Sequence, residues 1–186
     1  MKNKFLFVIV SICLISCSSK SKIIENFLVM EMIENEKKNN ILIKEKISYI
    51  YSRASFVPMN ISPILPEKSK IYQYLDKKYG NKDNKWRMFD EQKWEKKEFK
   101  KINFILISQD SLNLFVNSNP ILANNSNSYY ISNPFFYKEK GNQYVFFTVR
   151  FCKKIYCRNP VYDDVIILKK NNREWEFVER RPSPFL

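Results

Sequence analysis

The most regular hydrophobic pattern in the chain lies in residues 129–178. Within it, residues 144–151 alternate, so that Val145, Phe147, Val149 and Phe151 share one face. This period of two is typical of a strand with one buried face. The apolar run Val165–Leu168 predicts a second strand and Trp175 marks a third. Asn171-Asn172 predicts the hairpin turn between them, because asparagine tolerates positive φ. We therefore expect three antiparallel strands here.

Helical spacing recurs in two stretches before this region. Apolar residues three and four positions apart predict a helix over residues 23–36, and a second over residues 67–79 that ends at Gly80. Residues 41–51 fit either a strand or a helix. Their β-branched and aromatic side chains favour a strand.

The middle of the chain predicts shorter elements. Asp90 can cap a short helix, with Phe89 and Trp94 at the spacing of a hydrophobic staple. Residues 102–107 form an apolar run that predicts a strand, and residues 114–116 predict a short strand within a loop rich in asparagine and serine.

Together these elements predict an α+β fold. We expect an antiparallel sheet of about four to six strands, with the N-terminal helices packed on one face. A chain of 186 residues has room for one domain with a sizeable core. The expected organisation is a lipoprotein signal peptide over 1–16, a lipidated cysteine and tether over 17–22, and a single domain over 23–186.

The first residues have the composition of a secretory signal. Lys2 and Lys4 precede the apolar run Phe5–Ile15, which is too short to span a bilayer as a mature helix. The run leads into Leu14-Ile15-Ser16-Cys17, which resembles the lipobox of bacterial lipoproteins. In those proteins the cysteine becomes the new N-terminus and is acylated, typically with palmitate. We therefore expect lipidation at Cys17, and the alternative is an ordinary secretory signal in which Cys17 is incidental.

The residues after Cys17 bear on the destination of the protein. In some Gram-negative groups an acidic run at this place resembles a surface-export signal, and Ser18–Lys22 contains none. The expected location is therefore the periplasmic face of the outer membrane, with the protein held there by lipid.

Two cysteines remain after the signal and the anchor, Cys152 and Cys157. An oxidising envelope and the short loop between them favour a structural disulfide. The alternatives are a redox-active pair, which usually has a tighter Cys-x-x-Cys spacing, and a two-thiolate metal site, for which no partner ligands are evident.

Charge and composition narrow the classes of partner. The net charge of +13 could attract anionic glycans or lipid head groups, although the lysines are scattered along the sequence. Aromatic residues among lysines, such as Trp94 and Phe99, could stack on single-stranded nucleic acid, but an exported protein rarely meets it. The chain has no histidine and two glycines, which argues against hydrolytic triads, zinc sites and phosphate-binding loops. No metal or cofactor is predicted.

A family resemblance appears in the C-terminal half. Its elements are Tyr130-Ile131-Ser132-Asn133-Pro134-Phe135-Phe136, Tyr144-Val145-Phe146-Phe147, Cys152 and Cys157, Ile167-Leu168-Lys169-Lys170, and Glu174-Trp175. This pattern resembles a group of uncharacterised Bacteroidetes lipoproteins, and it departs from that group at Arg158 and Arg173, where glycine is usual. The resemblance implies a fold and a compartment but no activity. In addition, Asp110-Ser111-Leu112 resembles the O-glycosylation site of Bacteroidetes-type bacteria, which makes Ser111 a candidate for modification.

The leading functional hypothesis is a non-enzymatic envelope protein that binds or scaffolds an envelope protein or an anionic glycan. The rival is a carboxylate-dependent hydrolase acting on an envelope polymer, which would need an acid and a base across a cleft. The candidate carboxylates are Asp90, Glu91, Asp163, Asp164, Glu174 and Glu176. In extended chain Asp163 and Asp164 would point to opposite faces, and we interpret both as residues of solvated strand faces.

Overall fold

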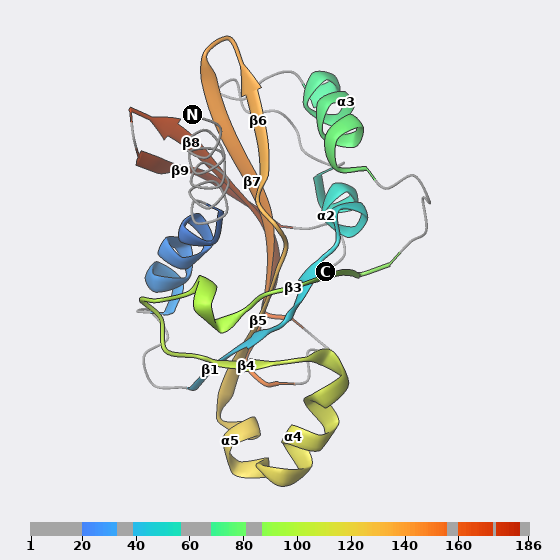
Figure 1. Ribbon diagram of the computed structural model, residues 1–186, viewed down its shortest axis with the longest axis vertical. Coiled ribbons are helices and arrows are strands. Elements are labelled where there is room, and N and C mark those ends of the chain that lie inside the picture. The colour runs from blue at the N-terminus through green and yellow to red at the C-terminus, as the bar shows by residue number, and fades with distance from the viewer. Residues whose placement is uncertain are drawn as a thin grey trace, which may run out of the picture.

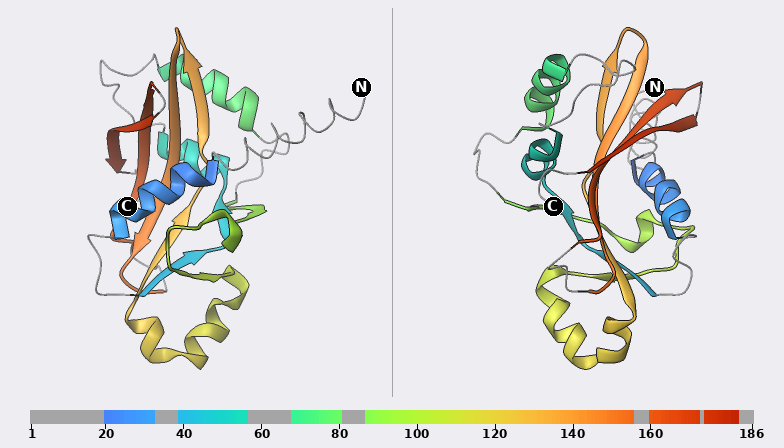
Figure 2. Two further views of the ribbon diagram at one scale, coloured as in Figure 1. Left: turned by 60° about the vertical axis from the view of Figure 1, so that its left-hand side comes forward. Right: turned by 180° about the vertical axis from the view of Figure 1, so that it is seen from behind.

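A computed structural model describes residues 20–32, 39–56, 68–80, 87–155, 160–172 and 174–182. Within these ranges a large twisted sheet forms the centre of the molecule, and helices lie on both sides of it (Figure 1). Residues 20–32 are helical and lie on the opposite side of the sheet from α2 and α3 (Figure 2).

The main sheet has seven strands in the order β4-β1-β5-β7-β8-β9, with β6 pairing to β7 as well. The strands are β1 (Asn39–Ile43), β4 (Ile105–Ile107), β5 (Ser126–Ile131), β6 (Phe135–Glu139), β7 (Asn142–Cys152), β8 (Tyr162–Asn171) and β9 (Glu174–Pro182). Strand β1 runs parallel to both β4 and β5, and the other pairings are antiparallel. Two short strands, β2 (Glu45–Ile47) and β3 (Phe89–Lys93), form a separate antiparallel pair.

The expectation of a purely antiparallel sheet of about four to six strands was therefore only partly correct. The hairpins β7-β8-β9 are antiparallel as predicted, whereas β4, β1 and β5 are parallel. The chain reaches β5 from β4 through α4 (Leu112–Ser118) and α5 (Pro120–Asn124), and such a crossover is what parallel pairing requires. Both faces of β1 are covered, since Ile41, Leu42 and Ile43 are each 0% exposed.

Strand β7 separates two hydrophobic cores. Val145 and Phe147 pack against the helix of residues 20–32, where the Phe27 and Phe147 rings meet edge to face at 5.2 Å between centroids. Tyr144 and Phe146 point the other way, into a core with Leu75 of α3 (Lys68–Tyr79) and Tyr49 of α2 (Tyr49–Phe56). The predicted alternation was confirmed, but both faces of this strand are buried. The N-terminal helices consequently cover two faces of the sheet, which corrects the prediction that they share one.

Several local predictions can be compared with the structure. Residues 41–51 divide into strands β1 and β2 and the start of α2, so both interpretations were correct in part. Gly80 follows α3, where a Cβ would lie 2.4 Å from the carbonyl oxygen of Asp76. Asn172 has φ of 52° in the β8–β9 hairpin, as predicted.

Two predicted elements were wrong. Asp90 caps no helix, because it lies in strand β3. Trp94 is nevertheless buried, and its Nε1 donates a hydrogen bond of 3.2 Å to the carbonyl of Ile131. Residues 114–116 belong to α4 and not to a strand. Of the strand predicted over residues 102–107, only residues 105–107 form a strand, which is β4.

Candidate functional site

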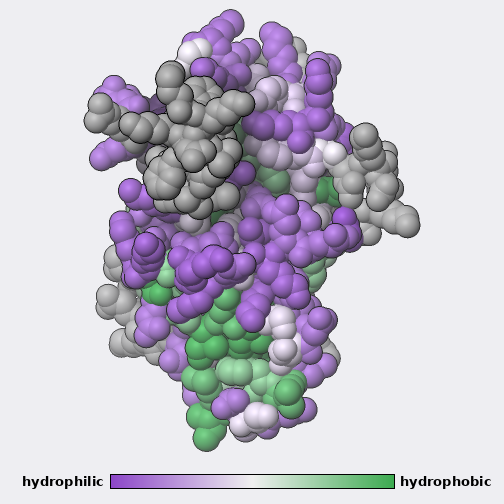
Figure 3. Space-filling model, viewed as in Figure 1, coloured by the Kyte–Doolittle hydropathy of each residue, from purple (hydrophilic) through white to green (hydrophobic). Residues whose placement is uncertain are grey.

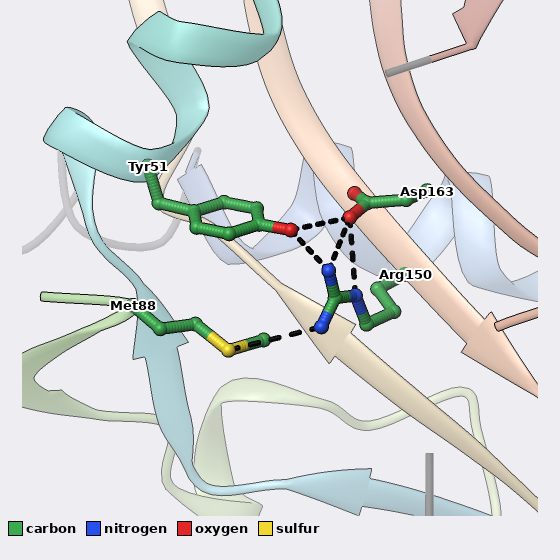
Figure 4. A network of polar contacts seen from close by, with 4 residues as sticks. All are labelled: Tyr51, Met88, Arg150 and Asp163. Carbon is green, nitrogen blue, oxygen red and sulfur yellow. Dashed lines mark hydrogen bonds and ion pairs between the residues drawn. The ribbon is translucent and has the colours of Figure 1, made fainter. Parts of the chain in front are cut away.

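Among the described residues, the most buried charged side chain is that of Asp163, on β8. It lies opposite Arg150 of β7, and the alternation of both strands turns the two side chains toward α2. Asp163 Oδ2 accepts hydrogen bonds from Arg150 Nη2 at 2.5 Å, from Arg150 Nε at 3.1 Å and from the Tyr51 hydroxyl at 2.6 Å (Figure 4). Arg150 Nη2 also donates to the Tyr51 oxygen, and Nη1 lies 3.8 Å from the sulfur of Met88.

The electrostatics of this network favour a fixed ion pair. The Asp163 side chain is fully buried and that of Arg150 is 15% exposed. Burial, and then the hydrogen bond to Asp163, raise the pKa of the Tyr51 phenol. Tyr51 therefore keeps its proton and acts as a donor at neutral pH. The network joins α2 to β7 and β8.

A second network lies on the other face of β8, around Asp164. Arg180 of β9 donates through Nε to Asp164 Oδ2 at 2.5 Å and through Nη1 to Glu31 Oε1 at 3.0 Å. The Tyr162 hydroxyl donates to Glu31 Oε2 at 2.5 Å, and its ring lies 4.0 Å from the Arg180 guanidinium. Burial raises the pKa of Asp164, and Arg180 opposes that shift. This network ties the helix of residues 20–32 to β8 and β9.

The positions of Asp163 and Asp164 test whether these carboxylates could be the acid and base of a hydrolase. Asp163 and Asp164 point to opposite faces, as predicted, but both are buried, so interpreting them as solvated residues was wrong. Their burial became possible because arginines on neighbouring strands neutralise them. Glu174 and Glu176 are exposed on β9. Since Asp163 and Asp164 are separated by the sheet, they cannot flank one scissile bond as paired acid and base.

The structure describes two of the four residues for which a covalent modification or a disulfide was predicted, namely Cys152 and Ser111. Cys17 and Cys157 lie outside the described residues, so lipidation and the disulfide remain predictions. Cys152 is buried at the end of β7. Ser111 is exposed at the end of a 3-10 turn, Gln109–Ser111, and its hydroxyl lies 2.7 Å from that of Ser108. Within the described residues, no helix has the length and apolar character needed to cross a membrane.

A large hydrophobic surface covers β4, α4 and α5 (Figure 3). We call it the β4–α4 surface and define it by Ile105, Leu106, Leu114, Phe115 and Ile121. The side chains of Leu114 and Ile121 are 72% and 77% exposed. A groove of about 400 Å³ runs along β4 beside α4, and its lining includes Leu106, Leu114 and Phe115. Apolar patches of this kind usually mark interaction sites.

The two strands at the ends of the main strand order differ in how their outer sides are protected. Edge strand β9 carries Glu174, Glu176, Glu179, Arg180 and Arg181 and ends at Pro182, all of which discourage pairing with another strand. Edge strand β4 has the sequence Ile-Leu-Ile without a charge. No strand among the described residues pairs with its outer side. The groove, which Lys44, Ser108, Ser111, Ser118 and Asn119 also line, therefore lies along this open edge.

The apolar strand that contains β4 and the carboxylate of Asp163 were both recognised in the sequence, but the exposed side of α4 and the partners of Asp163 were not. The helical spacing of Leu112, Phe115 and Val116 could have revealed α4 and its exposed side. Nothing in the sequence links Tyr51 to Asp163, which lies 112 positions further along the chain.

No protein-family model matches the chain, and no curated protein or solved structure matches it either. The resemblance to Bacteroidetes lipoproteins stays a prediction.

Proposed function

We propose that this protein is a lipid-anchored protein of the bacterial cell envelope that binds an extended segment of a partner protein along β4. The signal sequence and the lipobox ending at Cys17 support the anchor and the compartment. Acylation with more than one chain would hold the protein stably on the membrane. The resemblance in the C-terminal half supports the same compartment, and the lack of an acidic run after Cys17 favours the periplasmic face of the outer membrane.

The observation that carries the binding proposal is the open edge of β4, whose three residues are uncharged, beside a groove lined by apolar side chains together with Lys44 and polar side chains. Lys44 donates its backbone N–H to the carbonyl of Ile107 at 2.9 Å, so the main-chain groups of Ile107 face β1. Successive residues of a strand direct these groups to alternate sides, which turns those of Leu106 to the open edge. The carbonyl of Phe104 faces the same way and accepts from Lys96 Nζ at 2.7 Å.

An added strand would match both parts of this surface. Its main chain would pair with Leu106, and its side chains would enter the groove between β4 and α4. Leu114 and Ile121 would lose their contact with water, which gives the hydrophobic contribution to binding. The hydrolase remains the weaker proposal, because Asp163 and Asp164 lie on opposite faces and are both paired with arginine.

Site-specific photocrosslinking in intact envelopes tests this proposal. A photoreactive amino acid at Leu114 should give a discrete protein adduct, because this side chain borders the groove. The same group at Lys138, which is exposed on β6, is the control and should give none.

Two substitutions at Leu106 separate main-chain pairing from side-chain packing. Leu106→Pro removes the outward N–H, and proline is tolerated on an edge strand. Leu106→Ala shortens the side chain and keeps that N–H. The proposal predicts that Leu106→Pro abolishes the adduct at Leu114 and that Leu106→Ala retains most of it. An absence of adducts at Leu114, or equal adducts at Lys138, would contradict the proposal.

A further inference from the structure

Six lysines from three separate parts of the sequence gather around one open pocket of about 660 Å³. We call it the lysine pocket. It is lined by Ser21, Lys22, Glu25, Lys46, Lys93, Glu95, Lys97, Glu98, Lys100 and Lys101. The first turn of the helix of residues 20–32 forms one wall, and the segment around the 3-10 turn η1 (Lys96–Glu98) forms another. The side chains give the pocket a formal net charge of +3, from six lysines and three glutamates.

The three glutamates are already engaged within the fold. Glu25 is buried, and its Oε1 accepts hydrogen bonds from the backbone amides of Lys100 and Lys101. Glu98 Oε2 accepts from the backbone amide of Glu95 at 2.8 Å, and Glu95 pairs with Lys97 at 2.5 Å. Their carboxylates therefore organise the pocket wall, while the net charge around the pocket stays positive.

Two lysines of the pocket, Lys22 and Lys100, remain available to an external anion. Lys22 and Lys100 are exposed, and neither forms an ion pair with another residue of the described ranges. Lys46 is held in place over the ring of Trp94, with Nζ 4.0 Å from the centroid. The lysines outnumber the glutamates, and a cleft with net positive charge attracts anions, which suits this pocket to phosphate or another anionic group.

The position of the pocket relative to the predicted anchor identifies the anion. Three residue steps separate Cys17 from Lys20, and a fully extended chain spans at most about 3.5 Å per step, or about 10 Å in all. A lipid on Cys17 thus holds the first helical turn close to the membrane surface. Lys22 in that turn lines the lysine pocket.

The opposite flank of the same turn is apolar. Lys22 also lines a groove of about 620 Å³ between the helix of residues 20–32 and the β8–β9 hairpin. Met30 and Phe177 border this groove and are 56% and 55% exposed. Trp175 lines it as well, and tryptophan favours the boundary between lipid and water. Cationic and apolar groups thus occur together beside the anchor, as on proteins that lie on a membrane surface.

We infer that the lysine pocket binds the anionic phosphate groups of the lipids in which the protein is anchored. This inference rests on the proposed lipid anchor at Cys17, but not on the partner proposed for β4. Contact with head groups adds an electrostatic attachment to the acyl chains and gives the domain one defined face toward the membrane. The β4–α4 surface is then presented in a fixed orientation.

Amine footprinting of the lipidated full-length protein tests this inference. The protein is reconstituted into vesicles of phosphatidylcholine, with or without phosphatidylglycerol, and exposed to a water-soluble acylating reagent. Mass spectrometry then gives the modification of each lysine. Protection in the anionic vesicles only is expected for Lys22, Lys97, Lys100 and Lys101. The controls are Lys138 and Lys140, which are also exposed and should react equally in both types of vesicle.

Salt and charge variants provide the controls. Protection should disappear when salt is raised from about 0.1 M to about 1 M, because the Debye length falls from about 10 Å to about 3 Å. Lys22→Glu with Lys100→Glu should abolish the protection of Lys97 and Lys101. The same charge reversal at Lys138 and Lys140 should not. Circular dichroism of each variant checks that it has folded.

The outcomes separate this inference from its premise. A protein that is not acylated and does not float with vesicles refutes the anchor, and with it the inference. A protein that floats normally but shows equal lysine reactivity in both vesicle types refutes the inference alone. Protection by soluble dextran sulfate without protection by anionic vesicles would reassign the pocket to an anionic glycan.

Discussion

Substitution of Asp163 by asparagine should destabilise the fold far more than its modest change in shape suggests. Asparagine keeps the size of the side chain but removes the charge that neutralises Arg150. The Arg150 side chain is only 15% exposed, and it would be left without a carboxylate. Removing one partner of a buried pair typically costs about 3–5 kcal/mol, and we expect a loss near this range.

An exposed ion pair serves as the matched control. Arg87 and Glu91 lie 3.0 Å apart with side chains 41% and 85% exposed. Exposed pairs contribute about 0–1 kcal/mol, so Glu91→Gln should change the free energy of unfolding by less than about 1 kcal/mol. The comparison isolates burial, because both substitutions replace a carboxylate by its amide.

Urea unfolding of the purified variants, followed by circular dichroism, measures these differences. The double variant Arg150→Met with Asp163→Leu removes both charges and should recover much of the stability lost in Asp163→Asn, since no buried charge is left unpaired. The reasoning would be refuted if Asp163→Asn cost as little as Glu91→Gln, or if the double variant were no more stable than Asp163→Asn.

Three further predictions concern pH and covalent state. Burial raises the pKa of Tyr130 to about 12, so the folded protein should lose stability between about pH 10 and 12, and Tyr130→Phe should remove about 3 kcal/mol of that loss in alkaline unfolding experiments. Burial also raises the pKa of Asp164 above that of the same carboxyl in the unfolded chain. The free energy of unfolding should therefore fall as pH rises from the usual carboxyl pKa through the raised one. Asp164→Asn should flatten this part of the stability–pH curve, and an unchanged slope would contradict the assignment. Thiol alkylation without reductant should leave Cys152 and Cys157 unmodified, whereas ready alkylation of both would indicate free thiols.

The features predicted best from sequence are those set by local pattern. The alternation over residues 144–151 identified β7, and Asn172 marked the turn between β8 and β9. Helical spacing placed α3 within a residue of its observed start. Each of these depends on neighbours within a few positions, which is the range that periodicity describes.

The parallel pairing of β1 with β4 and β5 could not be predicted in this way. Ile41 pairs with Ile105 and with Ser128, which are distant in sequence, and short apolar runs do not specify their partners. The prediction that residues 114–116 form a strand failed because three apolar residues fit either period. The packed spacing of Leu112, Phe115 and Val116 decides in favour of a helix.

The partners of the charged residues could not be predicted from the sequence either. Asp163 and Asp164 were expected to be solvated because sequence alone gives no sign of an arginine opposite them. The lysines appeared scattered, yet the fold brings Lys22, Lys46 and Lys100 to one pocket. The burial of Asp163 and Asp164 and the clustering of the lysines both depend on contacts between residues far apart in the sequence. Local sequence patterns do not reveal such contacts.

We propose that a lipid on Cys17 anchors the protein in the envelope, and the other proposals about its membrane orientation depend on this anchor. Mass spectrometry of the N-terminal peptide from protein purified out of native membranes tests it most directly. We expect a peptide that begins at Cys17 and carries the added mass of a diacylglycerol group, and we expect Cys17→Ser to leave an unprocessed precursor. A mature chain that begins elsewhere, or a Cys17 without acyl groups, would contradict the account.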